Sequence, residues 1–256
     1  MDLNCDLGEL PAAIADGTQE ALLRCITSAN VACGGHAGDA QTMRVTIEQA
    51  LRAGVAIGAH PGYPDRANFG RLELKMPPEA LAASICEQVR TLAEIAAACG
   101  ARLVHVKPHG ALYNQAVQDR GLAAAIAHGV AMWGKEAVLV GLAGSPMLNV
   151  FREAGFAVAA EAFADRRYEP DGTLRSRKFA DALLRGPAEA ARQALSIAQR
   201  GVVTACDGAE VRLTAETICI HGDTPGAPQI AAAVADSLRE AGIGLGALGS
   251  RAHDPT

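Results

Sequence analysis

Ionisable side chains that could carry chemistry follow short apolar runs of this chain, at the points where those runs end. The segments are NCDLGE (4–9), NVACGGHAGD (30–39), GAHPGYPD (58–65), VKPHGALYN (106–114), EAFADRR (161–167) and HGDTPGA (221–227). They supply aspartate, histidine and lysine, the side chains of acid–base catalysis, metal binding and charge neutralisation. Four of the seven histidines follow an apolar run directly. This concentration of ionisable residues at the ends of apolar runs indicates an enzyme.

Two chemistries fit the histidines and carboxylates. Asp6, His36 and His60 could hold a divalent metal with open positions for substrate, or could hydrogen-bond substrate without a metal. Acid–base catalysis by an aspartate and a histidine is better supported, because an oriented imidazole titrates near neutrality. Asp6 with His36, and Asp223 with His221, are the pairs that we expect to do this.

The stretch 30–39 also suits anion binding. Gly34 and Gly35 allow the backbone to approach a ligand, and the helix expected after them offers free N–H groups. A nucleophilic Cys33 is the weaker reading, since a small cysteine at a strand end usually packs in the core. Lys107 could neutralise a carboxylate or a phosphate. The chain has no GxxxxGK[ST] motif, so ATP use could not rest on a P-loop.

The elements that must position these groups alternate along the chain. Apolar runs predict strands at 2–5, 28–32, 55–59, 103–106, 137–141, 157–160 and 217–220. Ala/Leu-rich stretches predict helices at 19–26, 39–53, 78–99, 121–133, 146–154, 187–199 and 225–241, with Asp39 as an N-cap. Such alternation is typical of a parallel sheet covered by helices, and about seven units favour a closed barrel.

We therefore expect an α/β fold, a single-domain seven-stranded β/α barrel over residues 1–256. A polar excursion is expected at about 164–186 and a short hairpin within 201–216. In a parallel barrel the carboxyl ends of all strands lie on one face, where catalytic residues gather. The polar side chains that follow the strands should therefore share one site.

Composition narrows the classes of protein. The net charge of -5 argues against a nucleic-acid binder. No uncharged apolar run reaches the roughly 18 residues that a bilayer span needs, so no membrane association is expected. The seven cysteines form no CxxC pair and the N-terminus is not signal-like, which favours a reduced, cytoplasmic setting.

Eight ordered motifs resemble those of the LamB/YcsF family. They are DLNCDLGE (2–9), SANVACGGHAGD (28–39), GAHPGYPD (58–65), FGR (69–71), VKPHGALYN (106–114), EAFADRRY (161–168), DGTL (171–174) and ICIHGDTPGA (218–227). The resemblance implies a distorted TIM-like barrel of the glycoside hydrolase/deacetylase type. It also implies ATP-dependent hydrolytic opening of 5-oxo-L-proline (pyroglutamate) to L-glutamate, together with two further subunits, B and C. Self-association into a homo-oligomer stays open.

The same resemblance suggests roles for individual residues. In deacetylase-like barrels an aspartate after the first strand and two histidines bind a metal, at positions that match Asp6, His36 and His60 here. Three positions depart from the family pattern: Gly35 replaces an aromatic residue, Leu10 begins a segment that is usually Ser-Phe-Gly, and Leu72 replaces a second arginine. These departures bear on the shape of the pocket.

A lactam is stable, so the implied reaction first activates its carbonyl, by phosphorylation, and then adds water. That sequence needs cations, a clamp for the substrate carboxylate and a base. The expected catalytic residues are Asp6, His36, His60, Lys107, His109 and His221. The expected substrate- or phosphate-binding residues are Asn4, Asn30, Gly34, Gly35, Arg71, Tyr113, Asn114, Glu161, Arg166 and Asp223.

Two other classes of protein compete with this interpretation. One is a stand-alone metal-dependent hydrolase or deacetylase that acts on an amide or a sugar. The other is a non-catalytic subunit that only positions partner chains. The clustering of ionisable residues after the strands argues against the second.

Overall fold

A closed barrel of seven parallel strands forms the centre of the molecule. The computed structural model describes residues 1–249. The strands follow the order β1-β2-β3-β4-β5-β6-β9 around the barrel. They are β1 (Asp2–Leu7), β2 (Ser28–Ala32), β3 (Ala56–His60), β4 (Leu103–Val106), β5 (Val138–Leu142), β6 (Val158–Phe163) and β9 (Thr217–His221). The structure confirms the seven-stranded α/β barrel expected from the sequence.

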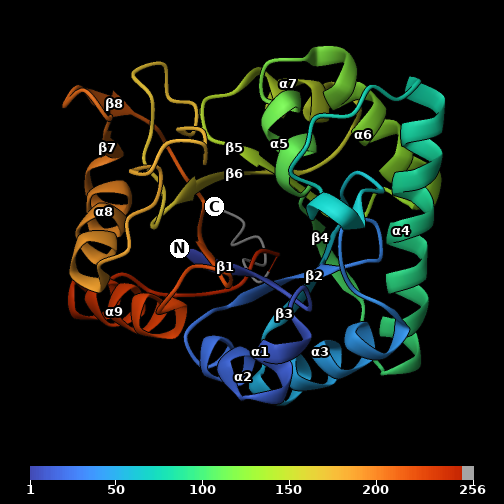
Figure 1. The fold of residues 1–256 in the computed structure, drawn as a ribbon, viewed down its shortest axis with the longest axis horizontal. Coiled ribbons are helices and arrows are strands. Elements are labelled where there is room, and N and C mark those ends of the chain that lie inside the picture. Colours follow the sequence, from blue (N-terminus) through green and yellow to red (C-terminus); the bar gives the residue numbers. More distant parts are fainter. Residues whose placement is uncertain (250–256) are drawn as a thin grey trace, which may run out of the picture.

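Helices surround the strands (Figure 1). They are α1 (Pro11–Ala15), α2 (Thr18–Leu23), α3 (Ala40–Ala53), α4 (Pro78–Ala98), α5 (Gly110–Ala116), α6 (Arg120–Trp133), α7 (Pro146–Glu153), α8 (Pro187–Arg200) and α9 (Ala227–Glu240), with a 3-10 turn η1 (Arg66–Asn68). Seven of these lie within a few residues of the predicted helices. Short α1, α5 and η1 were not predicted, because so few residues do not show a helical period. None of the helices within residues 1–249 is long and apolar enough to cross a membrane.

Local sequence signals set the ends and faces of the long helices. Asp39 caps α3 as expected: its side chain accepts from Thr42 N at 2.8 Å, and Thr42 Oγ1 accepts in turn from Asp39 N. In α4 the predicted apolar stripe faces the core, where Leu81, Ile85 and Val89 are buried. These helices hold the strands whose ends carry the polar side chains.

The barrel interior contains several buried polar side chains. Thr217 Oγ1 donates to Asp2 at one end of the barrel and accepts from Asn4 Nδ2 at 2.6 Å. In the middle layer, the ring of His105 fills the space beside Gly58, where a Cβ would lie 2.2 Å from His105 Nε2. All four of these polar side chains are buried, so their hydrogen bonds must form for the barrel to close.

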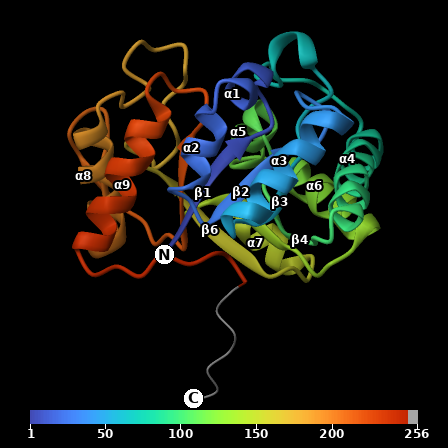
Figure 2. The same cartoon turned by 90° about the horizontal axis from the view of Figure 1, so that it is seen from below.

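The segment between β6 and α8 contains no helix and projects above α8, at the same end of the molecule as α1 (Figure 2). It was expected to be a polar surface excursion at about 164–186. Its beginning is buried: Tyr168 is 0% exposed, and its Oη accepts from Phe163 N at 2.7 Å. The expected hairpin is present as the antiparallel pair β7 (Val202–Thr204) and β8 (Glu210–Arg212).

Gly58→Ala should destabilise the barrel strongly, because the added methyl would overlap the His105 ring. We expect the free energy of unfolding to fall by about 3 kcal/mol, the upper part of the range for overpacked cores. Urea unfolding followed by circular dichroism measures this. Gly244→Ala is the control, since a Cβ there meets nothing within 4 Å. Equal stability of the two variants would contradict the packing described.

Candidate active site

The polar side chains that follow the strands meet at the carboxyl end of the barrel, as the sequence predicted. They form two adjoining clusters. The lysine cluster consists of Lys107, Asp6 and Glu161 with their hydrogen-bond partners, and the histidine cluster consists of Glu9, His36, His60 and His109. All seven side chains are buried.

Lys107 holds the lysine cluster together. Its Nζ lies 3.0 Å from Asp6 Oδ1 on β1 and 2.9 Å from Glu161 Oε1 on β6. It also contacts Asn4 Oδ1 at 3.3 Å and Cys219 Sγ on β9 at 3.0 Å. One ammonium group therefore connects three strands of the barrel.

Charge pairing fixes the protonation states in this cluster. Burial opposes the charge of Lys107, but the facing carboxylates of Asp6 and Glu161 together outweigh it, and the pKa of Lys107 is well above its usual range. Burial likewise opposes ionisation of Asp6, yet His60 and Lys107 hold the pKa of that carboxyl well below its usual value. Burial raises the pKa of the Cys219 thiol, which therefore stays protonated. At neutral pH the cluster contains an ammonium ion and ionised Asp6.

Asn30 orients Asp6 from the neighbouring strand. Its Nδ2 donates to Asp6 Oδ1 at 2.8 Å and to Asn4 Oδ1 at 2.7 Å, while its Oδ1 lies 2.6 Å from His105 Nε2. Because the amide oxygen can only accept, His105 Nε2 carries the hydrogen. Burial lowers the pKa of His105 to about 3, so the ring is neutral. This neutral donor fixes the amide of Asn30 and, through it, the carboxylate of Asp6.

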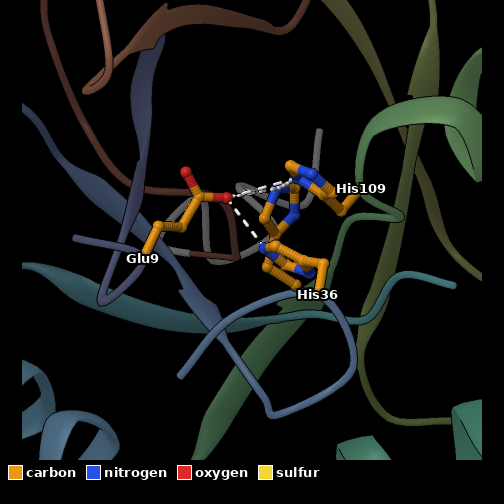
Figure 3. A group of neighbouring side chains, drawn as sticks. Glu9, His36 and His109 are labelled. Carbon is orange, nitrogen blue, oxygen red and sulfur yellow. Dashed lines mark hydrogen bonds and ion pairs between the residues drawn. The ribbon is translucent and has the colours of Figure 1, made fainter. Parts of the chain in front are cut away.

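The histidine cluster is built around one carboxylate oxygen. Glu9 Oε1 lies 2.9 Å from His36 Nε2 and 3.2 Å from His109 Nδ1 (Figure 3), and 3.8 Å from His60 Nε2. The rings of His36 and His109 stack with their centroids 3.6 Å apart. His60 ends β3, whereas the other three follow β1, β2 and β4. Four consecutive strands thus contribute one residue each.

Two backbone carbonyls fix the tautomers of His60 and His109. His60 Nδ1 lies 2.7 Å from Lys107 O, and His109 Nε2 lies 2.9 Å from Phe69 O. A carbonyl only accepts, so each of these nitrogens carries a hydrogen. The opposite nitrogens, His60 Nε2 and His109 Nδ1, face each other at 3.0 Å. In neutral rings both would present lone pairs, so this approach requires a cation between them, either a proton or a metal.

The surroundings shift the other titrating groups of this cluster in different directions. Burial disfavours the charged form of His60, but the carboxylate of Asp6 outweighs it and raises the pKa of His60. Burial lowers the pKa of His36 to about 4, so His36 is neutral. The ring nitrogens of His109 and His36 that face the carboxylate of Glu9 overcome the effect of burial and hold the pKa of Glu9 below its usual value. Opposite shifts of this kind are typical of acid–base sites.

Glycine residues leave room for the stacked rings of His36 and His109. A Cβ on Gly62 would lie 2.9 Å from His36 Nδ1, and one on Gly70 would lie 2.8 Å from His36 Cβ. Gly35 serves a different contact: a Cβ there would lie 2.3 Å from Gln88 Oε1, whose amide pairs with the backbone of Gly62 at 3.0 and 2.8 Å. The departure at Gly35 thus accommodates Gln88, while the other two departures, Leu10 and Leu72, are exposed.

His221 lies beside the lysine cluster and is oriented by Asp165. His221 Nδ1 is 2.9 Å from Asp165 Oδ1, and His221 N donates to Asp165 Oδ2 at 3.0 Å. The ring stacks on Phe163. The sequence paired His221 with Asp223, but Asp223 instead accepts from two arginines, Arg71 and Arg177. The partner of His221 is thus a buried carboxylate just after the neighbouring strand β6.

Of the remaining predicted residues, some are buried near the two clusters and others have partners elsewhere. Tyr113 is buried near Glu161, and burial together with that carboxylate raises the pKa of Tyr113 well above its usual range. Arg166 is also buried. Asn114 donates to Gly110 O of its own helix, and the carbonyl of Gly34 accepts from Arg66 rather than facing the clusters.

Sequence reasoning did not select Glu9, Asp165 or His105. Glu9 shares the motif NCDLGE with Asp6, which was the available signal. His105 lies inside β4 rather than after it, so its position gave no such signal. Cys33 is buried and its pKa is raised to about 12 by burial, which supports its reading as a packing residue.

Two groups of side chains within residues 1–249 could hold a metal ion. One is Glu9, His36, His60 and His109, and the other is Asp6, Cys219 and His221; in each, one ligand atom per residue lies within 4.8 Å of the rest. The expected ligands Asp6, His36 and His60 are divided between the groups, although Asp6 Oδ2 is 3.3 Å from His60 Nε2.

Related proteins cover nearly the whole chain. The A subunit of 5-oxoprolinase from Chloroflexus aggregans is 52% identical over 243 residues, 95% of this chain and 96% of the relative. The protein of the same name from Methylococcus capsulatus is 48% identical over 97% of this chain and 96% of its own.

Solved structures agree with the fold. The crystal structure of the lactam utilization protein from Thermus thermophilus superposes with a TM-score of 0.88 at 41% identity, covering 96% of this chain and 98% of that one. A putative cellobiose-phosphate cleavage protein from Enterococcus faecalis, with a TM-score of 0.56 and 16% identity over 98% of both chains, shares the fold alone. The model of the LamB/YcsF family matches residues 1–253. The chain therefore belongs to the LamB/YcsF family.

Proposed function

We propose that this chain is the A subunit of a 5-oxoprolinase, which opens 5-oxo-L-proline to L-glutamate by ATP-coupled hydrolysis together with subunits B and C. The observation that carries the proposal is the 46–52% identity to proteins named as the A subunit of 5-oxoprolinase along almost their full lengths. The word subunit in that name supports partner chains. ATP enters because a stable lactam needs activation of its carbonyl before water can open the ring.

The lysine cluster suits the charge that develops during lactam opening. Negative charge accumulates on the carbonyl oxygen, or on a phosphoryl group attached to it, and a fixed ammonium stabilises either one. Lys107 is held for this role by Asp6 and Glu161. The buried surroundings strengthen the interaction because they exclude water.

His221 is the group that we assign to proton transfer. Asp165 holds His221 Nδ1 at 2.9 Å, which leaves the other ring nitrogen free to accept a proton from water. The side chain of His221 is 12% exposed, whereas that of Asp165 is fully buried. A buried carboxylate that orients a more accessible imidazole is an arrangement suited to acid–base catalysis.

We also propose that Glu9, His36, His60 and His109 hold a divalent metal ion. The fit rests on the facing nitrogens of His60 and His109, which backbone carbonyls hold in the tautomers that bind a cation. A bound divalent ion would polarise a carbonyl oxygen and lower the pKa of water. Because of this cluster, the second candidate function is that of a metal-dependent hydrolase that acts without partner chains.

Glutamate release from 5-oxoproline tests the function. We expect ATP-dependent release when the chain is combined with subunits B and C, and none from the chain alone, because activation of the lactam needs the whole assembly. Release from the complete assembly without ATP consumption would contradict the proposal. Hydrolysis of simple amides by the chain alone would favour the second candidate.

Asp6→Asn should abolish most turnover while the barrel still folds. The substitution keeps the shape of the side chain but removes the charge that pairs with Lys107 and His60. We expect turnover of the reconstituted assembly to fall about 10²- to 10⁴-fold. Asp236→Asn is the control, because Asp236 is exposed on α9 and pairs with Arg239. Full turnover in Asp6→Asn would remove Asp6 from the mechanism.

Metal analysis of the purified chain tests the proposed ligands. We expect close to one divalent ion per chain, lost in His109→Ala, and a melting temperature that falls on chelation because the ion binds only the folded state. His128→Ala on the exposed face of α6 is the control and should keep its metal. If the purified chain contains no metal, and neither a chelator nor added divalent ions change its melting temperature, the metal proposal is wrong. A proton would then lie between His60 and His109.

A further inference from the structure

Asp223 forms ion pairs at the mouth of the barrel with arginines from two segments that are distant in sequence. Arg71, just after η1, and Arg177, in the segment between β6 and α8, both contact Asp223 Oδ2. The distance from Arg177 Nη1 is 3.1 Å, and Arg177 Nη2 also approaches Asp223 Oδ1 at 3.5 Å. One carboxylate therefore serves two guanidinium groups.

A third arginine, Arg166, interacts electrostatically with Arg177 and with the neighbouring carboxylate of Asp165. Arg166 is 4% exposed, its Nη2 donates to Arg175 O at 2.6 Å, and its Nε is buried with no hydrogen-bond partner within residues 1–249. Burial and the positive charge of Arg177 lower the pKa of Arg166 to about 10. The adjacent Asp165 is already engaged by His221 and by Thr224.

The arginines at the mouth are thus incompletely paired. Arg71 and Arg177 share the single carboxylate of Asp223, and the buried Nε–H of Arg166 lacks an acceptor within residues 1–249, which is costly. Asp223 lines the same small hollow as Asp6 and Glu9, so the carboxylate that the two arginines contact lies next to both clusters. An anion at this position would supply the missing acceptors.

We propose that Arg71, Arg166 and Arg177 form an oxyanion-binding subsite in which Asp223 occupies the arginines at rest and a carboxylate or phosphoryl group of the ligand displaces it. Planar guanidinium groups bind both kinds of oxyanion through paired hydrogen bonds. The choice between them rests on the proposed function, whose substrate carries one carboxylate and whose activation supplies a phosphoryl group. The subsite itself rests only on the geometry of the mouth.

Titration calorimetry of the chain with inorganic phosphate tests the subsite. We expect Arg71→Gln and Arg177→Gln each to weaken phosphate binding about tenfold, the effect of losing one charged hydrogen-bond partner. Arg175→Gln is the matched control, because Arg175 lies in the same segment but pairs with Glu169 and Asp181. It should bind phosphate as the unaltered chain does.

Asp223→Asn gives the more distinctive outcome. If Asp223 is the resting occupant, removing its charge frees both arginines and phosphate should bind several-fold more tightly. Asp236→Asn is the control for the change in net charge, because it removes the carboxylate that pairs with Arg239 on α9. Absence of phosphate binding, insensitivity to both arginine substitutions, or equal effects of the two aspartate substitutions would overturn the proposal.

Competition identifies which oxyanion the subsite takes. If it takes the substrate carboxylate, 5-oxoproline displaces phosphate and 2-pyrrolidinone, the same lactam without the carboxylate, does not. If it takes a phosphoryl group, ATP displaces phosphate and 5-oxoproline does not. Because these titrations need no turnover, they decide the subsite even if the reconstituted assembly fails to release glutamate.

Discussion

The arrangement of the barrel mouth depends on the buried ammonium group of Lys107. A buried charge is tolerated only when opposite charges pair with it, and here they come from Asp6 on β1 and Glu161 on β6. The backbone oxygen of the same residue lies 2.7 Å from His60 Nδ1 and so sets the tautomer of that ring. Lys107 therefore connects the packing of the strands to both clusters of the site.

Some groups of the site are fully paired within the protein, whereas others lack a partner. Lys107 and Asp6 satisfy each other, and Asn30 fixes their geometry. By contrast, the facing nitrogens of His60 and His109 need a cation between them. Locked charges are preorganised for the transition state, while the incomplete groups indicate where ions and ligands bind. The proposed function uses both.

The sequence predicted the fold closely, because apolar runs and helix signals such as Asp39 act locally. It also predicted which face holds the polar side chains, since parallel strands end together. It could not assign partners: His221 pairs with Asp165 rather than Asp223. Nor could it select Glu9, because which carboxylate meets the histidines depends on the path of the loop after β1. Side-chain pairing across strands is a property of the closed barrel.

Nitrogen-15 NMR of the histidine rings tests the central claim most directly, namely that backbone carbonyls fix the two tautomers so that a cation joins His60 and His109. The account predicts a hydrogen on His60 Nδ1 and on His109 Nε2, with the opposed nitrogens either bound to a metal or sharing a proton. A hydrogen on His109 Nδ1 with a bare Nε2, or two neutral rings with free lone pairs, would contradict it.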